Sequence, residues 1–354
     1  MIDWLSFRVS KFGSCFSLPY SGHIESVDSK GVVEWQKSKS LSVDGSYSSR
    51  VFVRDEGHSI FVSGNLVKFF QGHNLFGVDS VRPLVSAFFR VLQSKFFIIF
   101  PSDFLHAVDA GHYRLLRVDA TAMFSLPSRS AVREWIRAAS VSVRGRYQGV
   151  SNYDSQSLYV GLRSTHNMLK IYCKGDEFEK HWRQLKLKNN LPIYEDLLSY
   201  CDAALRVELQ VNSRDLRARF IDHPVAWDFN YDELPLTYRL INEKISRLNF
   251  SFNYLSADII GDFMKRLNKK SQIVYQAWLS GFDLRSYYSK SQFYYHRSKI
   301  LSAVGIDIAI PNSEQSVTAI KSVPLIQYLI AQPMAVPDWA LGTEYFFDPH
   351  SNKI

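Results

Sequence analysis

The chain has 354 residues, of which 46% are hydrophobic and 14% aromatic, enough for two domains or for one large domain with an appendage. Lysine and arginine outnumber aspartate and glutamate by 42 to 34, and the resulting formal charge of +8 favours a polyanionic partner such as nucleic acid. The three cysteines lack Cys-x-x-Cys or Cys/His ligand spacing, so they indicate neither a disulfide scaffold nor a zinc site. We expect a cytoplasmic protein without membrane contact, because no uncharged stretch is long enough to span a bilayer and an acidic Asp3 stands where a signal peptide carries positive charge.

The first two-thirds of the sequence alternates β-branched or aromatic residues with polar ones in short bounded runs, which is typical of strands. The expected strands are Ile2–Val9, Val32–Lys37, Arg50–Arg54, Ser59–Ser63, Lys95–Phe100, Tyr113–Phe124, Ser157–Arg163, Asn167–Lys174 and Ala204–Asn212. Helical spacing predicts short helices at Leu66–Phe70, Val81–Gln93, Ser130–Ser140 and Asp176–Asn189. We therefore expect an α+β domain over residues 1–225, with a mainly antiparallel sheet and helices on one side of it.

After about residue 225 the pattern becomes helical, and a domain boundary near His223-Pro224 is expected. The helices predicted beyond it are Leu234–Asn249, Asp258–Asn268, Ser271–Leu279 and Ser289–Val304. They describe a smaller helical domain over residues 226–354. Pro324, Pro333 and Pro337 in its last part predict an irregular surface tail with one short helix around Leu325–Ala331.

Three of the expected strands place an acidic or phenolic group among cations on one face. Strand alternation puts Asp119 on the polar face of one strand and Glu208 on that of another, while Lys170 and Lys174 flank Tyr172 on a third. Two ammonium groups beside a phenol favour the phenolate, which is a good nucleophile towards phosphorus. Carboxylates on nearby strands are ligands that suit Mg²⁺ or Mn²⁺. Together these residues predict a metal-dependent tyrosine nuclease.

The same residues also have a plain structural interpretation. An Arg-x-Asp or Arg-x-Glu pattern on a half-exposed strand is usually a cross-strand salt bridge, and a tyrosine between lysines is usually a solvated amphipathic residue. Spacing alone therefore does not decide between a catalytic site and an ordinary sheet surface.

The order of short motifs along the chain is more specific. The motifs are Asp3-Trp4-Leu5-Ser6, Arg117-Val118-Asp119-Ala120, Leu158–Ser164, Ile171–Glu177 and Leu205-Arg206-Val207-Glu208-Leu209. This order resembles the replication initiation factors of filamentous phages and rolling-circle plasmids. The segments Phe70–Gly77, Val323–Ile326 and Pro337–Trp339 are similar to the gene II-like members of that family. The resemblance spans almost the whole chain and is thin between about residues 225 and 285.

The resemblance implies a nick in the plus strand of double-stranded phage origin DNA, leaving a free 3′-hydroxyl and a 5′-phosphotyrosine on the protein. The displaced single-stranded DNA is then rejoined into a circle, with host helicase and polymerase as partners in the bacterial cytoplasm. Carried onto this sequence, the nucleophile is Tyr172, and the phosphate contacts are made by Lys170, Lys174 and Arg163.

The acidic residues that the resemblance assigns are Asp3, Asp119 and Glu208. Many rolling-circle nucleases bind metal through a His-hydrophobe-His motif, and none of the ten histidines here lies two positions from another. A carboxylate cage must then replace the imidazoles, which suits Mg²⁺. For Asp3 an alternative stays open, because strand alternation places it on the same face as Leu5 and Phe7. Asp3 would then be a residue at the end of a strand that faces solvent, and not a metal ligand.

Two further segments have a functional and a structural interpretation. The polar stretch Gln71–Asn74 could touch the origin or orient a phosphate, or Gly72 could simply end the preceding helix as its cap.

In the C-terminal part, a serine at a helix start precedes Lys290, Gln292, Arg297 and Lys299. This pattern resembles the second helix of a helix-turn-helix that enters a DNA major groove. The alternative is an amphipathic helix with a basic outer face.

Two other functions fit part of the pattern. A non-catalytic DNA-binding regulator would use the same basic surface and C-terminal helices, but the carboxylate strands around Tyr172 would not help it. A tyrosine recombinase would place its nucleophile near the C-terminus amid arginine and histidine, without a metal. A covalent protein–DNA adduct and a strict need for a divalent metal distinguish the nuclease from both.

Overall fold

The structure of the protein is a computed structural model. It describes all residues except 12, 14–15, 20–21, 46–48, 146–149, 155–156, 187–192, 229–233, 251–266, 305–306, 310–331 and 349–354.

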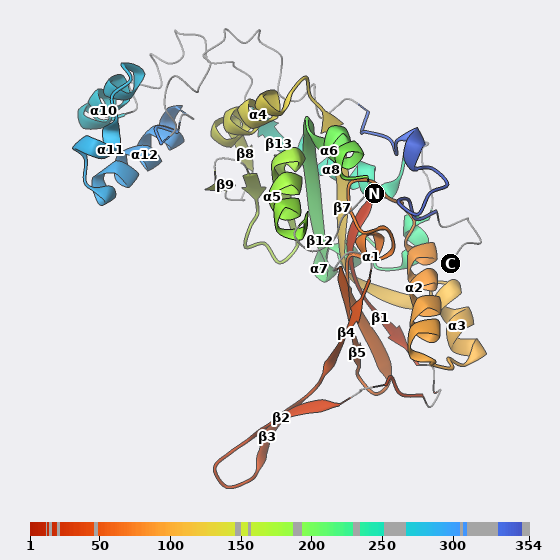
Figure 1. Ribbon diagram of the computed structural model, residues 1–354. Coiled ribbons are helices and arrows are strands. Elements are labelled where there is room, and N and C mark those ends of the chain that lie inside the picture. The colour runs from red at the N-terminus through yellow and green to blue at the C-terminus, as the bar shows by residue number, and fades with distance from the viewer. Residues whose placement is uncertain are drawn as a thin grey trace.

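Within the described residues, nine strands form one antiparallel sheet in the order β4-β5-β6-β1-β7-β12-β11-β10-β9 (Figure 1). Their bounds are β1 Ile2–Ser10, β4 Ser40–Asp44, β5 Arg50–Asp55, β6 Ser59–Gly64, β7 Tyr113–Ser125, β9 Val150–Asp154, β10 Ser157–Val160, β11 Asn167–Cys173 and β12 Ala204–Asn212. Alternation along these strands buries one apolar face, which is why the sequence specifies them. The predicted α+β fold with a mainly antiparallel sheet is confirmed.

Helices follow the strands in chain order. Their bounds are α1 Leu66–Gln71, α2 Val81–Phe96, α3 Ser102–Asp109, α4 Arg129–Ser142, α5 Lys174–Lys186, α6 Tyr194–Cys201, α7 Ser213–Ala218 and α8 Leu236–Ser246, with a 3-10 turn η2 at Pro224–Trp227. The largest core lies where α2, α4 and α8 bury the apolar face of β1, β7 and β12. On the opposite face, Met123 and Ala204 pack with Phe178 of α5 and Leu197 of α6. The prediction of helices on one side therefore describes the larger core, and α5 with α6 covers part of the other face.

The segment Lys95–Phe100 is not the buried strand that its apolar run predicts. Helix α2 continues to Phe96, and Phe97 ends it in the left-handed conformation at φ 53°, with its N–H bonded to the Gln93 carbonyl. The side chains then point alternately inward and outward along the loop, since Phe97 is 91% exposed and Phe100 is buried. A helix cap followed by an extended loop has the same alternation as a short strand, and this explains the wrong prediction.

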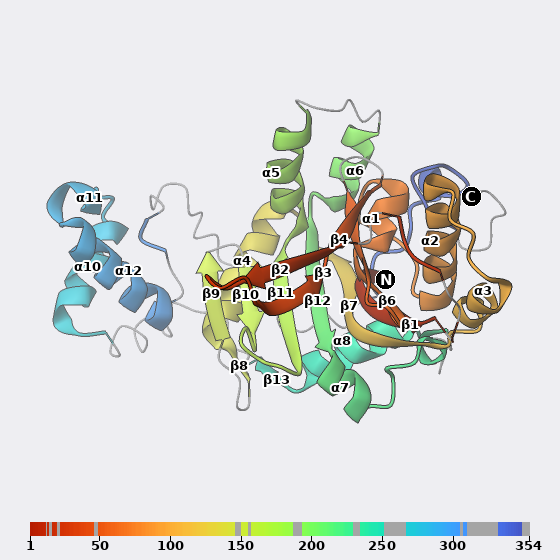
Figure 2. The same ribbon diagram turned by 90° about the horizontal axis from the view of Figure 1, so that it is seen from below.

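Strands β2 (His23–Val27) and β3 (Val33–Ser38) form a separate two-stranded ribbon. The ribbon projects away from the nine-stranded sheet (Figure 1), and in the view from below it is drawn across the front of the sheet (Figure 2). A second small pairing joins β8 (Val143–Gly145) to β13 (Leu248–Phe250).

The C-terminal helices build a core of their own. They are α10 Lys269–Leu279, α11 Leu284–Tyr287 and α12 Lys290–Val304, as the sequence predicts for the first and last of them. Their buried residues are Leu267, Val274, Tyr275, Trp278, Leu284, Phe293, Ile300 and Ile308. Most of the predicted helix Asp258–Asn268 and all of Leu325–Ala331 lie outside the described residues. Helix α8 packs on β7 and β12 of the large sheet, so the boundary expected after residue 225 stays a prediction.

Residues 332–348 pack against the sheet domain as an extended segment with one 3-10 turn, η4 (Asp338–Ala340). The Met334 amide donates to the Met123 carbonyl at 2.8 Å, and the Phe347 ring stacks on Phe70 with ring centres 4.4 Å apart. Among the described residues, no helix is long and apolar enough to cross a membrane.

Candidate active site

Tyr172 and Glu208 lie on neighbouring strands near the middle of the sheet. In the β11–β12 register, Lys170 faces Glu208 and Tyr172 faces Arg206, so all four side chains share one face. The Tyr172 hydroxyl donates a 2.7 Å hydrogen bond to Glu208 Oε1, and the tyrosine is 5% exposed. The sheet therefore brings the predicted nucleophile and one predicted carboxylate into direct contact.

The environment of Tyr172 favours the neutral phenol. Burial and the nearby Glu208 carboxylate raise the pKa of Tyr172 well above its ordinary value. Lys170 Nζ lies 4.0 Å from the centre of the tyrosine ring, a cation–π contact, rather than at its oxygen. The expectation that two lysines hold a phenolate is therefore wrong for this arrangement, because one lysine stacks on the ring and the other, Lys174, is engaged elsewhere.

Lys174 is the first residue of α5, and its side chain is buried inside the site. Its Nζ donates to Glu177 Oε2 at 2.5 Å and to Asn74 Oδ1 at 3.0 Å. Burial raises the pKa of Glu177, but the Lys174 ammonium outweighs burial and holds that pKa at about 2. The pair joins the start of α5 to the loop that contains Asn74.

Arg206 is the buried cation at the centre of the cluster, with a side chain that is fully inaccessible to solvent. Its Nε donates to Glu208 Oε1 at 2.8 Å, its Nη2 lies 3.2 Å from Asp3 Oδ1, and its Nη1 donates to the Asn74 carbonyl. Burial lowers the pKa of Arg206, but the surrounding acidic groups outweigh it, so the guanidinium stays charged. The sequence placed Arg206 on a polar strand face and gave no sign that it would be enclosed.

Asp3 reaches this cluster because β1 is irregular at that residue. The pairing of β1 with β7 shifts register between Ile2 and Trp4, which is a β-bulge. With this bulge, Asp3 Oδ1 accepts hydrogen bonds from the side-chain amides of Asn65 and Asn74, at 2.6 Å and 2.9 Å, and lies next to Arg206. The strict alternation that would put Asp3 on the face of Leu5 is broken, and Asp3 joins the polar face.

Asn65 is a site residue that the sequence did not single out, and Asn74 was singled out only as part of the polar stretch Gln71–Asn74. Asn65 caps α1 by accepting a hydrogen bond from the Lys68 amide, and Asn74 contacts Asp3, Lys174 and Arg206 at once. Isolated asparagines have no diagnostic spacing, and only the cap position of Asn65 before a helix start was visible in the sequence.

The stretch Gln71–Asn74 turns out to be a cap and a structural loop. Gly72 ends α1 in the left-handed conformation with φ 86°, so the cap interpretation is confirmed. The amide nitrogen of Gln71 donates to the Phe76 carbonyl at 2.7 Å, and its oxygen accepts from the Phe347 amide at 3.0 Å. Burial lowers the pKa of His73 to about 3, and its Nε2 lies 2.9 Å from the Tyr345 carbonyl. The C-terminal segment thus fixes the loop that presents Asn74.

Asp119 lies on β7, where Gln210 of β12 faces it. Both of its oxygens accept from Arg117, at 2.8 Å and 2.5 Å. Burial raises the pKa of Asp119 to about 6 despite Arg117, and the charges of Asp3 and Glu208 contribute in the same direction. Asp119 is therefore close enough to the other two carboxylates to interact with them electrostatically.

The three carboxylates do not form a metal cage in this arrangement. Among the described residues, no group of three His, Cys, Asp or Glu side chains is placed to hold a metal ion. The guanidinium of Arg206 stands between Asp3 and Glu208, and Arg117 engages both oxygens of Asp119. Their oxygens are of the kind that Mg²⁺ prefers, so the metal prediction stays a prediction without a defined ligand geometry.

Arg163 is not part of the cluster. Strand β10 ends at Val160, and Gly161 turns the chain at φ 79°, so the predicted strand does not reach Arg163. The Arg163 side chain is exposed in this turn. Its predicted phosphate contact would have to be made at the surface.

The predicted DNA-contacting residues of α12 have different surroundings. Lys290, Gln292 and Lys299 are exposed, but Gln292 Oε1 accepts from the Ser289 hydroxyl at 3.0 Å in a helix-start motif. Arg297 makes a two-pronged ion pair with Asp307, with both hydrogen bonds at 2.6 Å. The two lysines are therefore accessible to DNA, and the arginine has a structural partner.

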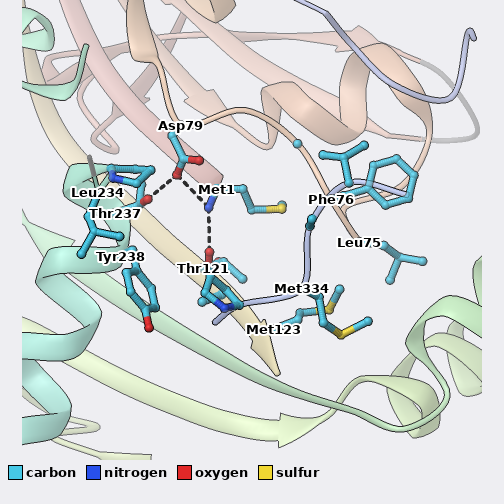
Figure 3. Close-up of a pocket in the computed structure, with 16 residues that line it drawn as sticks. Met1, Leu75, Phe76, Asp79, Thr121, Met123, Leu234, Thr237, Tyr238 and Met334 are labelled. Atoms are coloured by element: carbon cyan, nitrogen blue, oxygen red, sulfur yellow. Dashed lines mark hydrogen bonds and ion pairs between the residues drawn. The ribbon is translucent and has the colours of Figure 1, made fainter. Parts of the chain in front are cut away.

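A cavity of about 200 Å³ lies beside the cluster, between β7, α8 and the C-terminal segment (Figure 3). Met123 and Met334 lie on one side of it, and on another Asp79 bonds Thr237 and the Met1 amine. None of the predicted site residues lines this cavity, so it is separate from the Tyr172 cluster.

Comparisons with known proteins agree with the motif order. The family of the N-terminal part of the phage replication-associated protein, the gene II protein, matches residues 1–229, and its C-terminal counterpart matches residues 263–343. The replication-associated protein of Enterobacteria phage I2-2 is 30% identical over 349 residues, which is 95% of each chain. A solved structure, the rolling circle replication initiator protein from Geobacillus stearothermophilus, covers 72% of this chain and 87% of its own, with 12% identity and a TM-score of 0.30, too weak a likeness for any conclusion. The two family matches and the phage relative confirm the resemblance to gene II-like phage replication initiators, and the chain belongs to the family of phage replication-associated gene II proteins.

Proposed function

We propose that the chain is a rolling-circle replication initiator that nicks the plus strand of its phage origin with Tyr172. The observation that carries the proposal is the 2.7 Å hydrogen bond from the Tyr172 hydroxyl to Glu208, within a cluster of cations, in a chain of the gene II protein family. A buried phenol against a carboxylate is a nucleophile with its proton acceptor already in place.

In the proposed step, Glu208 Oε1 takes the phenolic proton as the Tyr172 oxygen attacks the scissile phosphorus in line. The new bond joins the tyrosine oxygen to phosphorus, and the bond from phosphorus to the 3′ oxygen breaks. The 3′ oxygen takes up a proton from solvent and becomes the free hydroxyl, Glu208 returns its proton to solvent, and the 5′ phosphate stays on the protein. One phosphodiester replaces another, so rejoining needs no ATP.

Lys170 is the cation that would offset charge on the pentacoordinate phosphorus, since its ammonium lies against the Tyr172 ring. Arg206 has a different role in this proposal. It holds Glu208 in position and balances the charge of the carboxylate before the proton is taken up, and Asp3 still balances Arg206 once Glu208 is neutral.

The expected Mg²⁺ or Mn²⁺ remains part of the proposal as a requirement of the reaction, with Asp3, Asp119 and Glu208 as its predicted ligands. All three carboxylates contact arginines in this structure, Asp3 and Glu208 through Arg206 and Asp119 through Arg117. The proposed partners are double-stranded origin DNA, the displaced single strand, and host helicase and polymerase in the bacterial cytoplasm.

The deciding experiment incubates the protein with supercoiled DNA that contains the phage's own origin, and maps the peptide of any covalent adduct. The adduct is expected on the peptide that contains Tyr172, and Tyr172→Phe should give neither adduct nor nick. The matched control is Tyr159→Phe, which removes the same atom from the adjacent strand. An adduct on Tyr159 would move the nucleophile, and origin binding without any adduct would make the chain a non-catalytic regulator.

A further inference from the structure

Lys68 of α1 and His181 of α5 face each other beside the Tyr172 cluster. Lys68 Nζ lies 3.1 Å from His181 Nε2, and both side chains are partly exposed. We propose that this pair binds a backbone phosphate of the DNA strand next to the scissile phosphate. The inference rests on the proposed function, because it names a second point at which the same substrate is held.

The first support is the way charges are paired. Arg206 is matched by Asp3 and Glu208, Lys174 by Glu177, and Arg117 by Asp119. Among the residues that the structure describes, no carboxylate oxygen lies within 4.0 Å of Lys68 Nζ. The polar side-chain contact of this ammonium is the imidazole of His181. An ammonium has three N–H donors, and one of them suffices for His181. Lys68 therefore has donors and charge left for an anion.

The second support is the environment of the ammonium. Burial and the charge of Lys174 lower the pKa of Lys68, and burial together with Lys68 lowers the pKa of His181. Placing an unpaired cation in such a site is costly, and an arriving phosphate removes the cost for both groups. A neutral imidazole that accepts from Lys68 can also rotate or take up a proton, and then donate to a phosphate oxygen.

The third support is the position of Lys68 relative to the catalytic cluster. Asn65, at the start of the same short helix, accepts from the Lys68 amide at 2.7 Å and donates to Asp3 Oδ1 at 2.6 Å. Lys68 is also near enough to Asp3, Glu177 and Lys174 for their charges to act on it. A strand whose scissile phosphate lies at Tyr172 would therefore pass this cation with a neighbouring phosphate.

The test uses a single-stranded oligonucleotide that carries the nick site, with Lys68→Met as the variant, because methionine keeps the length and removes the charge. We expect KM to rise about tenfold with kcat little changed, as for the loss of uniform binding. The slope of log affinity against log salt should fall by about 0.7, the value for one single-strand phosphate contact. Lys68→Arg should restore most of the affinity. Lys180→Met, on the exposed side of α5 next to His181, is the matched control and should match wild type.

A second measurement replaces one phosphate at a time in the oligonucleotide by an uncharged methylphosphonate. Wild-type protein should lose affinity at one linkage beside the nick, and Lys68→Met should be insensitive at that linkage. The scan on wild-type protein keeps the proposal testable even if the variant does not fold. Unchanged KM and salt slope in folded Lys68→Met, or the same linkage profile for both proteins, would overturn the phosphate site. Binding measured in a Tyr172→Phe background separates this outcome from failure of the nucleophile assignment.

Discussion

The Arg206 guanidinium and the Asp3 carboxylate are joined at 3.2 Å, although strand β7 lies between their two strands in the sheet. The contact is possible because the bulge in β1 turns Asp3 and because the arginine extends along the sheet surface. It connects the first strand of the chain to the strand that carries Glu208. The face of the sheet that carries Tyr172 and Glu208 is therefore held together by a buried ion pair as well as by the hydrogen bonds of the ladder.

Replacing Arg206 by glutamine should destabilise the protein strongly. The change leaves Asp3 and Glu208 as partly buried carboxylates without their shared cation, and breaking a buried pair in this way costs about 3–5 kcal/mol. Urea denaturation measures the loss in the free energy of unfolding. Arg163→Gln, an exposed position in a turn, should stay within about 0.5 kcal/mol of wild type. Equal midpoints for the two variants would show that Arg206 is not a structural cation.

Glu208→Gln should slow nicking by a factor of about 10²–10⁴, the usual contribution of a positioned proton acceptor. The amide keeps the size of the side chain and a hydrogen-bonding oxygen, so the variant should still bind the oligonucleotide. Single-turnover nicking rates check the prediction, together with binding of the uncleaved strand. A nicking rate within twofold of wild type would rule out Glu208 as the group that takes the Tyr172 proton.

The metal requirement has its own test. Nicking should stop in EDTA and return with Mg²⁺, and Asp119→Asn should lower the rate by orders of magnitude, with partial recovery in Mn²⁺. Arg117 also loses its ionic partner in this variant, so folding must be checked by denaturation. Equal wild-type rates in EDTA and in Mg²⁺ would refute the metal requirement.

The Glu177–Lys174 pair predicts a defined acid sensitivity. The pKa of Glu177 in the folded protein, about 2, lies below the ordinary value of 4.5. The stabilisation by the ion pair is therefore present above pH 4.5 and is lost as the pH falls towards 2. Glu177→Gln should therefore be less stable than wild type at neutral pH, and the difference should shrink below pH 4.5. Thermal unfolding of both proteins over this range measures it. A difference that stays constant with pH would show that the ion pair contributes no stability.

The C-terminal helix α12 separates binding from chemistry. Replacing Lys290 and Lys299 by alanine should weaken origin binding, with a salt slope smaller by up to about 0.9 for each lost contact to duplex DNA. Nicking of the short oligonucleotide should be spared. Arg297→Ala should instead lower the stability of the helical unit, because Asp307 loses its ion-pair partner. Origin binding that is unchanged in the double lysine variant would make α12 an ordinary exposed helix.

Alternation along the chain predicted seven of the nine strands of the sheet, because one buried apolar face marks a strand, and it missed β4 and β9. The β12 bounds Ala204–Asn212 match the prediction, and alternation correctly placed Lys170 with Tyr172 on one face of β11. Periodicity does not reveal interruptions of the pattern, such as the bulge at Asp3 or the left-handed cap at Phe97. Helix α3 was missed because the apolar run before it was taken for a strand.

Contacts between distant segments were out of reach for the same reason. Arg206 is enclosed by the loop at Asn74, and that loop is held by residues of the C-terminal segment. Asparagines and backbone carbonyls have no characteristic spacing in a sequence that would identify a site. Motif order, by contrast, points to chemistry directly, and for that reason the family was identifiable before the geometry was known.

The hydrogen bonds between the C-terminal segment and the loop at Gln71 bear on the order of events during synthesis of the chain. The bond from the Phe347 amide to Gln71 joins residues 276 positions apart, and His73 meets Tyr345 at a similar separation. On the proposed function, a growing chain on the ribosome therefore contains Tyr172 long before the residues that fix Asn74 against Asp3 and Arg206 have been made. We therefore expect a chain that ends before Tyr345 to lack the fixed loop at Asn74 and to nick origin DNA more slowly than the full chain.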